Sequence, residues 1–200
     1  MKLSTRLLPL PLLALPAAAA LPAGLTAQLQ ADAVVHLEFQ QVRTLAALSR
    51  PLKASGSLVV ARDRGVIWAL QKPIVITYVL GAHGLLVINP DGTRERRSER
   101  DAPVAAQAAK VFQAVAQGDW NALDSWFAAS GSGTPQHWEV ALQARPQAAS
   151  LVRRVRLEGG RFIDRIRLDE PGGDRTELDF TGQRADLPLT PEETRLLDQD

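Results

Sequence analysis

The side chains with the chemistry for metal binding, or for proton transfer near neutral pH, are few in this sequence. Its three histidines, His36, His83 and His137, lie far apart in the chain, and there is no cysteine. A zinc site needs several converging ligands, which sequences often show as HxH or HExxH spacings. Because neither spacing occurs, we expect these histidines to be surface or internally hydrogen-bonded side chains. We expect no metal and no other cofactor.

Serine and carboxylate chemistry is also disfavoured. The segment SGSG at 130–133 lacks the G-x-S-x-G turn between a strand and a helix that exposes a nucleophilic serine, and it indicates a flexible loop. Carboxylates near the C-terminus could supply a glycosidase pair, but most alternate with arginines on charged strand faces. They are Asp164, Asp169, Glu170, Asp174, Glu177 and Asp179. The chain is therefore expected not to be an enzyme.

Arginines form the third group of candidates. Six lie in the same C-terminal region: Arg153, Arg154, Arg156, Arg161, Arg165 and Arg167. They could face an anionic ligand or lipid headgroups, but the simpler interpretation is a solvated strand face. On such a face they would pair across strands with Glu158, Asp169, Glu177 and Asp179.

Arg62 differs from these six because it ends an apolar alternation. Leu58 and Val60 precede it at spacings of two, so a strand would direct Arg62 to their face. The alternative is that Arg62 merely begins a polar turn.

Composition and charge limit the function classes. The 200 residues predict one domain, and 46% hydrophobic residues suffice for a core. Basic and acidic residues number 23 and 22, for a formal net charge of +1. Such a chain has no strong field to attract nucleic acid, and nucleic-acid binding is not expected.

The N-terminus has the layout of a secretory signal peptide. Lys2 and Arg6 precede an apolar run, and small residues follow it. Cleavage is expected between Ala20 and Gln28, with a signal peptide in residues 1–27 and one domain in 28–200. An uncleaved anchor is the alternative, which the prolines within the segment disfavour. Without cysteine the chain has no disulfides and no lipid-acceptor residue. We expect an exported, soluble protein.

The elements that must position these residues follow from hydrophobic periodicity. A short helix near 26–33 is expected to lead into a strand around Val35 to Gln41. Helical spacing runs from Val104 to Gln117, and Asp119 caps a second helix. That helix is expected to carry Trp120, Leu123, Trp126 and Phe127, before a loop at 128–135. A final short helix, or a frayed end, follows Thr190. The other strand-like runs are 57–62, 65–71, 74–80, 85–89, 138–142, 155–157, 162–168 and 176–180.

The order of strands, helices and strands predicts an α+β fold. We expect a single curved antiparallel β-sheet of about eight strands that forms an incomplete, half-open β-barrel, with helices covering its concave face. The runs Ile74–Leu80 and Leu85–Ile88 are apolar on both faces. Such residues are either core under a covering helix or the lining of a ligand space.

The segment from Phe39 to Leu80 resembles the LolA family of periplasmic outer-membrane lipoprotein carriers. The shared features are F-x-Q at 39–41, P-L-x-x-S-G at 51–56, a strand ending in Arg62, an aromatic residue at Trp68, and Pro73. The segment 138–180 also looks like the carboxy-terminal strands of these proteins. In this family an arginine at the place of Arg62 reaches lid helices and holds the empty cavity shut. Arg64 could compete for that role, because Asp63-Arg64 replaces the usual Arg-Pro turn.

The resemblance implies a carrier that takes lipoprotein acyl chains from an inner-membrane ABC transporter to an outer-membrane receptor. A monomer is expected. Two alternatives stay open: a carrier of another lipid or pigment, and an envelope assembly or docking protein that uses a sheet edge or the basic strand face. The lipid-binding residues that the resemblance and the apolar pattern imply are Phe39, Leu58, Val60, Arg62, Val66, Trp68, Ile76, Tyr78, Trp126 and Phe127.

Overall fold

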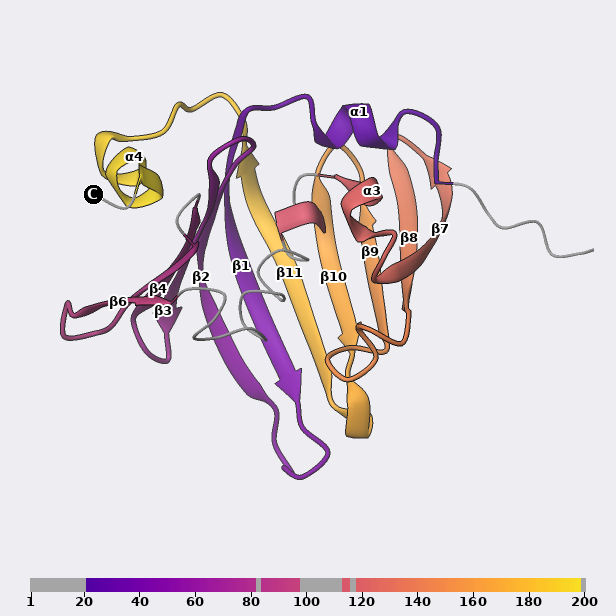
Figure 1. Ribbon diagram of the computed structural model, residues 1–200, viewed down its shortest axis with the longest axis horizontal. Helices are drawn as coiled ribbons and strands as arrows, with labels where there is room; N and C mark the ends of the chain where they lie inside the picture. The colour runs from indigo at the N-terminus through magenta and orange to yellow at the C-terminus, as the bar shows by residue number, and fades with distance from the viewer. Residues whose placement is uncertain (1–20, 82–83, 98–112, 116–117, 199–200) are drawn as a thin grey trace, which may run out of the picture.

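The computed structural model describes residues 21–81, 84–97, 113–115 and 118–198. These form one antiparallel sheet of eleven strands, which curves into an open half-barrel (Figure 1). The N-terminal strands are β1 (Val34–Thr44), β2 (Leu52–Ala61), β3 (Gly65–Lys72), β4 (Ile76–Gly81), β5 (Gly84–Ile88) and β6 (Arg94–Arg97). The C-terminal strands are β7 (Phe127–Thr134), β8 (His137–Ala144), β9 (Arg154–Gly159), β10 (Ile163–Asp169) and β11 (Arg175–Arg184).

The strand order is β6-β5-β4-β3-β2-β1-β11-β10-β9-β8-β7. The first strand of the chain, β1, and the last, β11, are therefore neighbours in the middle of the sheet. β1 joins the halves, because it pairs with β2 on one side and with β11 on the other. Phe39 of β1 lies opposite Gly56 and Phe180 in these two ladders. The expected α+β half-barrel is confirmed.

The concave face of the sheet carries the larger hydrophobic core. Its most completely buried side chains include Phe39, Phe127, Leu142, Leu157 and Val66. Helix α1 (Leu25–Leu29), which lies across one end of the half-barrel, and helix α3 (Trp120–Leu123), which lies inside it, contribute to this core (Figure 1). Ala114 and Val115, from the helical residues 113–115, also belong to it.

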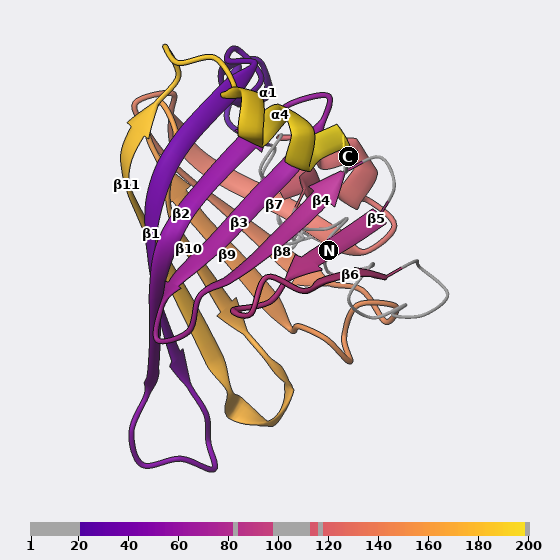
Figure 2. The same cartoon turned by 90° about the vertical axis from the view of Figure 1, so that its left-hand side faces the viewer.

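The third helix, α4 (Pro191–Asp198), lies on the outer face of the sheet, over β2, β3 and β4 (Figure 2). Its Leu197 is buried against a second apolar cluster, which contains Val59, Ala61, Ile67, Val79 and Leu86. Helices thus lie at the concave face, as expected, and α4 covers part of the outer face in addition. The two-sided apolar strands explain the difference, since their outward side chains also need cover from water.

The start of α4 has a reciprocal cap. The Thr190 N–H donates to Glu193 Oε2 (2.7 Å), and the Glu193 N–H donates to Thr190 Oγ1 (3.2 Å). Each bond satisfies a backbone donor that the first turn of a helix leaves without an intrahelical partner. Of the two sequence interpretations for this segment, the short helix is confirmed.

Several strand boundaries differ from expectation. β2 begins at Leu52 rather than Ser57, and continues through Gly56, where a Cβ would lie 1.9 Å from the carbonyl oxygen of Ala69. The expected loop at 128–135 is wrong, because most of it is the edge strand β7. A Cβ on Gly131 of β7 would lie 2.7 Å from Pro22 Cδ, so its lack of a side chain lets the N-terminal segment pack across the strand.

The helical region in the middle of the chain is only partly described. Most of the helix expected from Val104 to Gln117 lies outside the described residues. Residues 113–115 are helical, and Gly118 has a φ of 62°, which glycine readily adopts. Asp119 caps α3 as expected, through a 3.2 Å bond from the Ala122 N–H. Phe127, however, begins β7 instead of lying on that helix.

Candidate functional site

An apolar pocket lies on the concave face, near the end of the half-barrel that α1 crosses. Nine of its eleven lining residues are apolar, and the other two are Asp32 and Arg62. Its free volume is about 60 Å³, whereas pockets for drug-sized ligands span roughly 300–1,000 Å³. An acyl chain therefore needs the pocket to widen. The lining residues are Leu29, Asp32, Val35, Leu37, Leu58, Val60, Arg62, Phe162, Ile163, Ile166 and Phe180.

Strand alternation places Arg62 at this pocket. β2 ends at Ala61, but the Arg62 N–H donates a 2.9 Å hydrogen bond to the Ala33 carbonyl oxygen. This bond extends the antiparallel pairing of β1 with β2 by one residue beyond Val34 and Ala61. The side chain of Arg62 therefore lies on the same face as Leu58 and Val60, which also line the pocket.

Arg64 lies elsewhere, although it is only two residues away. Its Nη2 donates to Asp198 Oδ1 (2.6 Å) and to the Thr194 carbonyl oxygen (3.5 Å), both in α4. Arg64 thus binds the helix on the outer face of the sheet. Of the two arginines that the sequence left as candidates, only Arg62 lines the pocket.

A second arginine stands at the rim of the pocket. Arg161 Nη2 lies 3.3 and 3.4 Å from the two carboxylate oxygens of Asp32. The Arg161 guanidinium carbon is 4.9 Å from the centre of the Phe162 ring, which lines the pocket. One end of the otherwise apolar pocket thus carries three charged side chains, Arg62, Arg161 and Asp32.

Helix α1 packs across the same end of the half-barrel and is held there by apolar contacts and hydrogen bonds. Leu25 is fully buried and Leu29 forms part of the pocket wall. Gln28 Nε2 donates to the carbonyl oxygens of Pro135 (3.0 Å) and Gly160 (2.5 Å), in the turns after β7 and after β9. The helix is therefore positioned to cover the pocket, and a few side-chain hydrogen bonds hold it there.

The residues expected to bind lipid are distributed over the concave face. Leu58, Val60 and Arg62 line the pocket. Phe39 and Trp68 meet edge to face, with ring centres 4.9 Å apart. Val66, Trp126 and Phe127 pack in the same concave core. Ile76 and Tyr78 lie opposite Leu70 and Trp68 in the ladder between β3 and β4, and do not line the pocket.

Eight lining residues were not foreseen from the sequence. Val35 and Leu37 carry a readable signal, because they alternate with Phe39 on β1. Phe162 and Ile163 are adjacent in the chain and both line the pocket, which a strict alternation does not predict. The irregular register between Ile163 and Arg165 accounts for this difference.

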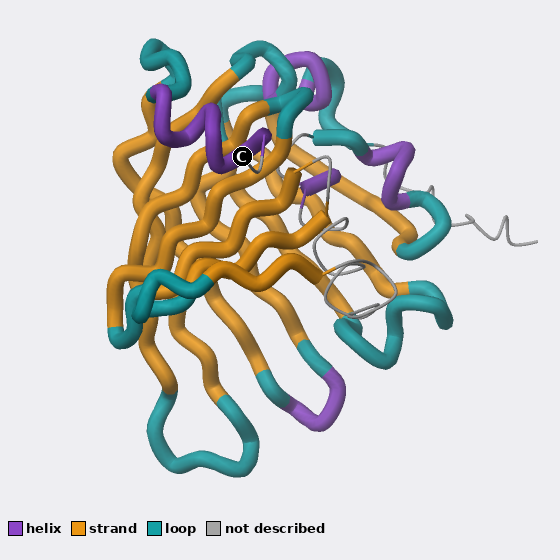
Figure 3. Tube along the Cα trace, turned by 60° about the vertical axis from the view of Figure 1, so that its left-hand side comes forward, coloured by secondary structure: helices purple, strands orange, loops and turns teal. Residues whose placement is uncertain are grey.

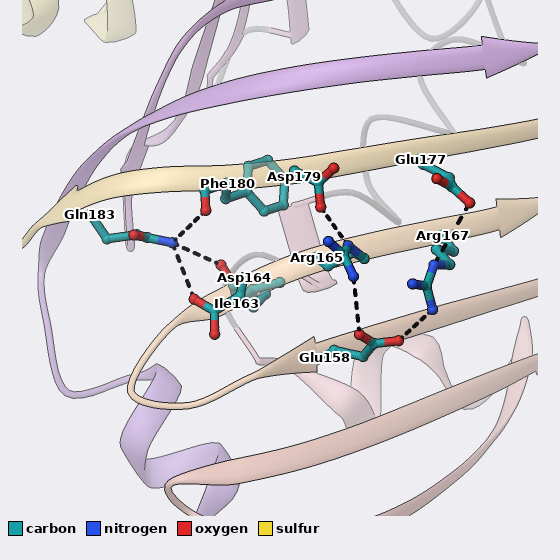
Figure 4. Close-up of polar contacts among 9 residues, drawn as sticks. All are labelled: Glu158, Ile163, Asp164, Arg165, Arg167, Glu177, Asp179, Phe180 and Gln183. Atoms are coloured by element: carbon teal, nitrogen blue, oxygen red, sulfur yellow. Dashed lines mark hydrogen bonds and ion pairs between the residues drawn. The ribbon is translucent and has the colours of Figure 1, made fainter.

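The arginines on the outer face of β10 are paired, as the simpler interpretation of the sequence predicted (Figure 4). Arg165 forms an ion pair with Asp179 and a longer one with Glu158 (3.8 Å). Arg167 lies 2.6 Å from Glu158 and 3.8 Å from Glu177. The hydrogen bond and the charge of Asp179 raise the pKa of Arg165. These pairs form a cross-strand network on a solvated face.

The two described histidines, His36 and His137, do not belong to a common metal site. His36 Nε2 lies 3.2 Å from Glu193 Oε1, so it ties β1 to α4. His137 begins β8, and His83 lies outside the described residues. Within the described ranges, no group of three His, Cys, Asp or Glu side chains is placed to hold a metal ion. None of the described helices is both long and apolar enough to cross a membrane.

The sequence profile of a protein family described as "Outer membrane lipoprotein carrier protein LolA-like" matches residues 15–178. A comparison with curated protein sequences gives no significant match. The match to the family thus covers most of the chain, including the whole sheet up to the middle of β11.

Solved structures with similar folds include a LolA superfamily protein from Nitrosomonas europaea. It is 10% identical, with a TM-score of 0.49, and the match covers 89% of this chain and 98% of that one. A DUF1329 family protein from Desulfovibrio piger is 11% identical, with a TM-score of 0.47 and coverage of 82% and 90%. The MucA/MucB complex of Pseudomonas aeruginosa gives 14% identity, a TM-score of 0.36 and coverage of 84% and 57%.

Proposed function

Because the chain belongs to the LolA-like family of outer membrane lipoprotein carrier proteins, we propose that it is a non-enzymatic periplasmic carrier. Its cargo is the acyl chains of a lipoprotein, or a related lipidic molecule, bound in the concave pocket. The observation that carries this proposal is the apolar pocket with Arg62 at its polar end.

The chemistry of the pocket suits an amphiphilic cargo. Each buried methylene contributes about 0.8 kcal/mol, so about ten methylenes supply roughly 8 kcal/mol of transfer free energy. Arg62 and the pair of Arg161 with Asp32 keep charge at one end, where the polar part of an amphiphile would remain. The apolar wall would hold the chain while its head stays near water.

A carrier must also release what it binds. The small free volume supports a cargo-free state that is closed, with α1 across the end of the half-barrel. Opening this state requires free energy, which offsets part of the gain from burying the chain. Arg62 is the residue that we expect to stabilise the closed state, since it lines the space that cargo would fill and the family's arginine at this place reaches the lid helices.

The family supports a proposal for the route of the cargo. The carrier would receive acylated cargo from an inner-membrane ABC lipoprotein-releasing transporter and deliver it to an outer-membrane lipoprotein receptor, acting as a monomer. A signal peptide would bring it to the periplasm. A glycolipid or pigment cargo would use the same pocket with different partners.

Native mass spectrometry of protein isolated from the periplasm tests this proposal. The mature protein should carry an acylated molecule that dissociates in organic solvent. Val60→Gln, which places an amide at the pocket, should reduce the loaded fraction. Leu187→Gln, a change at an exposed site, should not. Protein that never carries an acylated molecule, even when overproduced with lipoproteins, contradicts the carrier proposal.

A second candidate is an envelope docking protein that carries nothing. The observation in its favour is the same free volume of about 60 Å³, which is small for a pocket that must hold an acyl chain. The carrier should be isolated with cargo and the docking protein without it. The fraction of isolated protein that carries an acylated molecule therefore distinguishes the two candidates.

A further inference from the structure

Large apolar side chains that face water gather at one end of the sheet. Among the described residues, four exposed ones lie there: Leu48, Leu52, Ile74 and Val75, with between 47% and 60% of each residue accessible. The fifth, Leu187, is 38% exposed and follows β11 at the opposite end. Single exposed apolar residues are ordinary on protein surfaces, but a gathering of them is a feature of interaction sites.

The four residues belong to two neighbouring connections. Leu48 lies in the β1–β2 hairpin and Leu52 begins β2, while Ile74 and Val75 lie between β3 and β4. β2 pairs with β3, and the register places Ser55 opposite Lys72, so both connections leave the sheet at the same end. Figure 3 shows the β1–β2 hairpin projecting beyond the body of the sheet.

The charges in these connections have a single sign. Arg50, Lys53 and Lys72 are exposed there, and residues 45–53 and 71–75 contain no aspartate or glutamate. No ion pair involves these three cations within the described part of the chain. The nearest carboxylates of the adjoining β10–β11 turn have other partners. Glu170 binds Arg43 (2.8 Å), and Asp174 accepts a hydrogen bond from the Ala46 N–H (2.8 Å).

We propose that this basic apolar tip, formed by the four apolar residues and the three cations, docks reversibly on an anionic lipid membrane surface. Apolar side chains that enter the interface gain from burial, and neighbouring lysines and arginines are attracted to anionic headgroups. The charge of the tip complements such a surface. Insertion is shallow, because the polar backbone of a turn cannot be satisfied in the hydrocarbon core.

The tip is remote from the pocket. Leu52 and Arg62 stand at the two ends of the β2 segment, about 33 Å apart for ten residues at roughly 3.3 Å each. Docking at the tip thus leaves the α1 end of the half-barrel accessible to cargo or to a partner. The inference goes beyond the carrier proposal and does not depend on what the pocket holds.

Vesicle co-sedimentation with the mature protein tests the proposal. The probes are vesicles of phosphatidylcholine alone and vesicles in which about one third of the lipid is phosphatidylglycerol, each at low and at physiological salt. We expect binding to the anionic vesicles at least about tenfold tighter than to the neutral ones, and weaker with added salt.

Variants separate the two contributions. Leu48→Ser with Ile74→Ser should weaken binding to anionic vesicles about tenfold. Lys53→Glu with Lys72→Glu should remove the preference for anionic lipid. Leu187→Ser, the exposed control at the other end, should bind as the parent does. Circular dichroism spectra should match the parent's, because all five positions are exposed. Fatty-acid binding, measured in parallel, should also be unchanged.

Three results overturn the inference. The first is that anionic vesicles do not bind the parent, and the second is that the double variant Leu48→Ser with Ile74→Ser binds them as tightly as the parent does. The third is tip-dependent binding to envelope membranes that is lost on protease treatment, together with no binding to pure lipid vesicles, because the tip then docks on a protein. In each case normal fatty-acid binding leaves the carrier proposal intact.

Discussion

Arg62 and Arg64 are two residues apart, and their side chains lie on opposite faces of the sheet. Arg62 lines the concave pocket, whereas Arg64 Nη2 binds Asp198 Oδ1 of α4 (2.6 Å) on the outer face. The turn after β2 separates them, since the Arg64 N–H donates to the Ala61 carbonyl oxygen (3.1 Å) and reverses the chain. Two chemically identical side chains therefore provide matched test and control positions.

Substitution of Arg62 by leucine is expected to change cargo binding more than stability. If Arg62 stabilises the closed pocket, its loss favours the open state, so cargo should bind at least about fivefold tighter and leave more slowly. Fluorescence titration and stopped-flow release measure both quantities. Arg64→Leu should leave cargo affinity unchanged. Equal effects of the two substitutions on affinity contradict the role assigned to Arg62.

The outer apolar cluster predicts that α4 stabilises the sheet. Leu197 is 2% exposed and packs in the cluster that contains Val59 and Ile67. Leu197→Ala should lower the free energy of unfolding by about 2–5 kcal/mol, since it leaves a cavity. Leu187→Ala, at an exposed site, should change it by less than about 0.5 kcal/mol. Urea denaturation measures both, and similar values for the two would mean that α4 contributes little.

The contact between Glu193 and His36 predicts a dependence of stability on acid. Burial alone would raise the pKa of Glu193. Hydrogen bonds from the Thr190 N–H, the His36 ring and the Thr190 hydroxyl outweigh burial and hold this pKa below its ordinary value. A carboxylate with a lowered pKa stabilises the fold above the ordinary glutamate pKa of about 4.3, and that contribution is lost as pH falls further.

Thermal melts between about pH 3 and pH 7 would check this dependence, because this range extends from roughly one unit below to three units above the ordinary glutamate pKa. Glu193→Gln should melt lower than the parent near neutral pH, and the difference should shrink in acid. Glu192→Gln, the neighbouring exposed carboxylate, is the control. A difference that stays constant across this range would show that charge on Glu193 does not stabilise α4.

The packing of the first described residues predicts where a signal peptide would be removed. Leu21 packs against the concave core, and Leu25 of α1 is fully buried. Cleavage after Ala20 keeps both residues, and Ala18-Ala19-Ala20 also suits the peptidase. We expect intact-mass analysis of the exported protein to show Leu21 as the first residue. An N-terminus beyond Leu25 would mean that the mature fold lacks most of α1.

The sequence was most informative where one face of a strand is apolar and the other charged. The strands with Val155 and Leu157, and with Ile166 and Leu168, were predicted because alternation is a direct consequence of a dry and a wet face. β7 was missed because its serines and glycines carry no such pattern. The small β6 was missed because all four of its residues are exposed.

The pocket could be predicted only in part, because alternation relates residues within one strand and does not relate residues in different elements. Alternation placed Arg62 beside Leu58 and Val60, within a single strand. Leu29 and Asp32 join the pocket because α1 crosses the end of the half-barrel, which depends on contacts such as those of Gln28 with turns more than a hundred residues away. Local periodicity contains no information about such contacts. The outer position of α4 was missed for the same reason.

Titration of the mature protein with a fluorescent fatty acid tests the central claim, that the concave pocket binds acyl chains, most directly. We expect saturable binding of one or a few chains, which a natural fatty acid displaces. Val60→Trp, which fills the pocket, should lose binding while Leu187→Trp keeps it. The absence of saturable binding by the parent, or undiminished binding by Val60→Trp with an unchanged circular dichroism spectrum, would contradict the account.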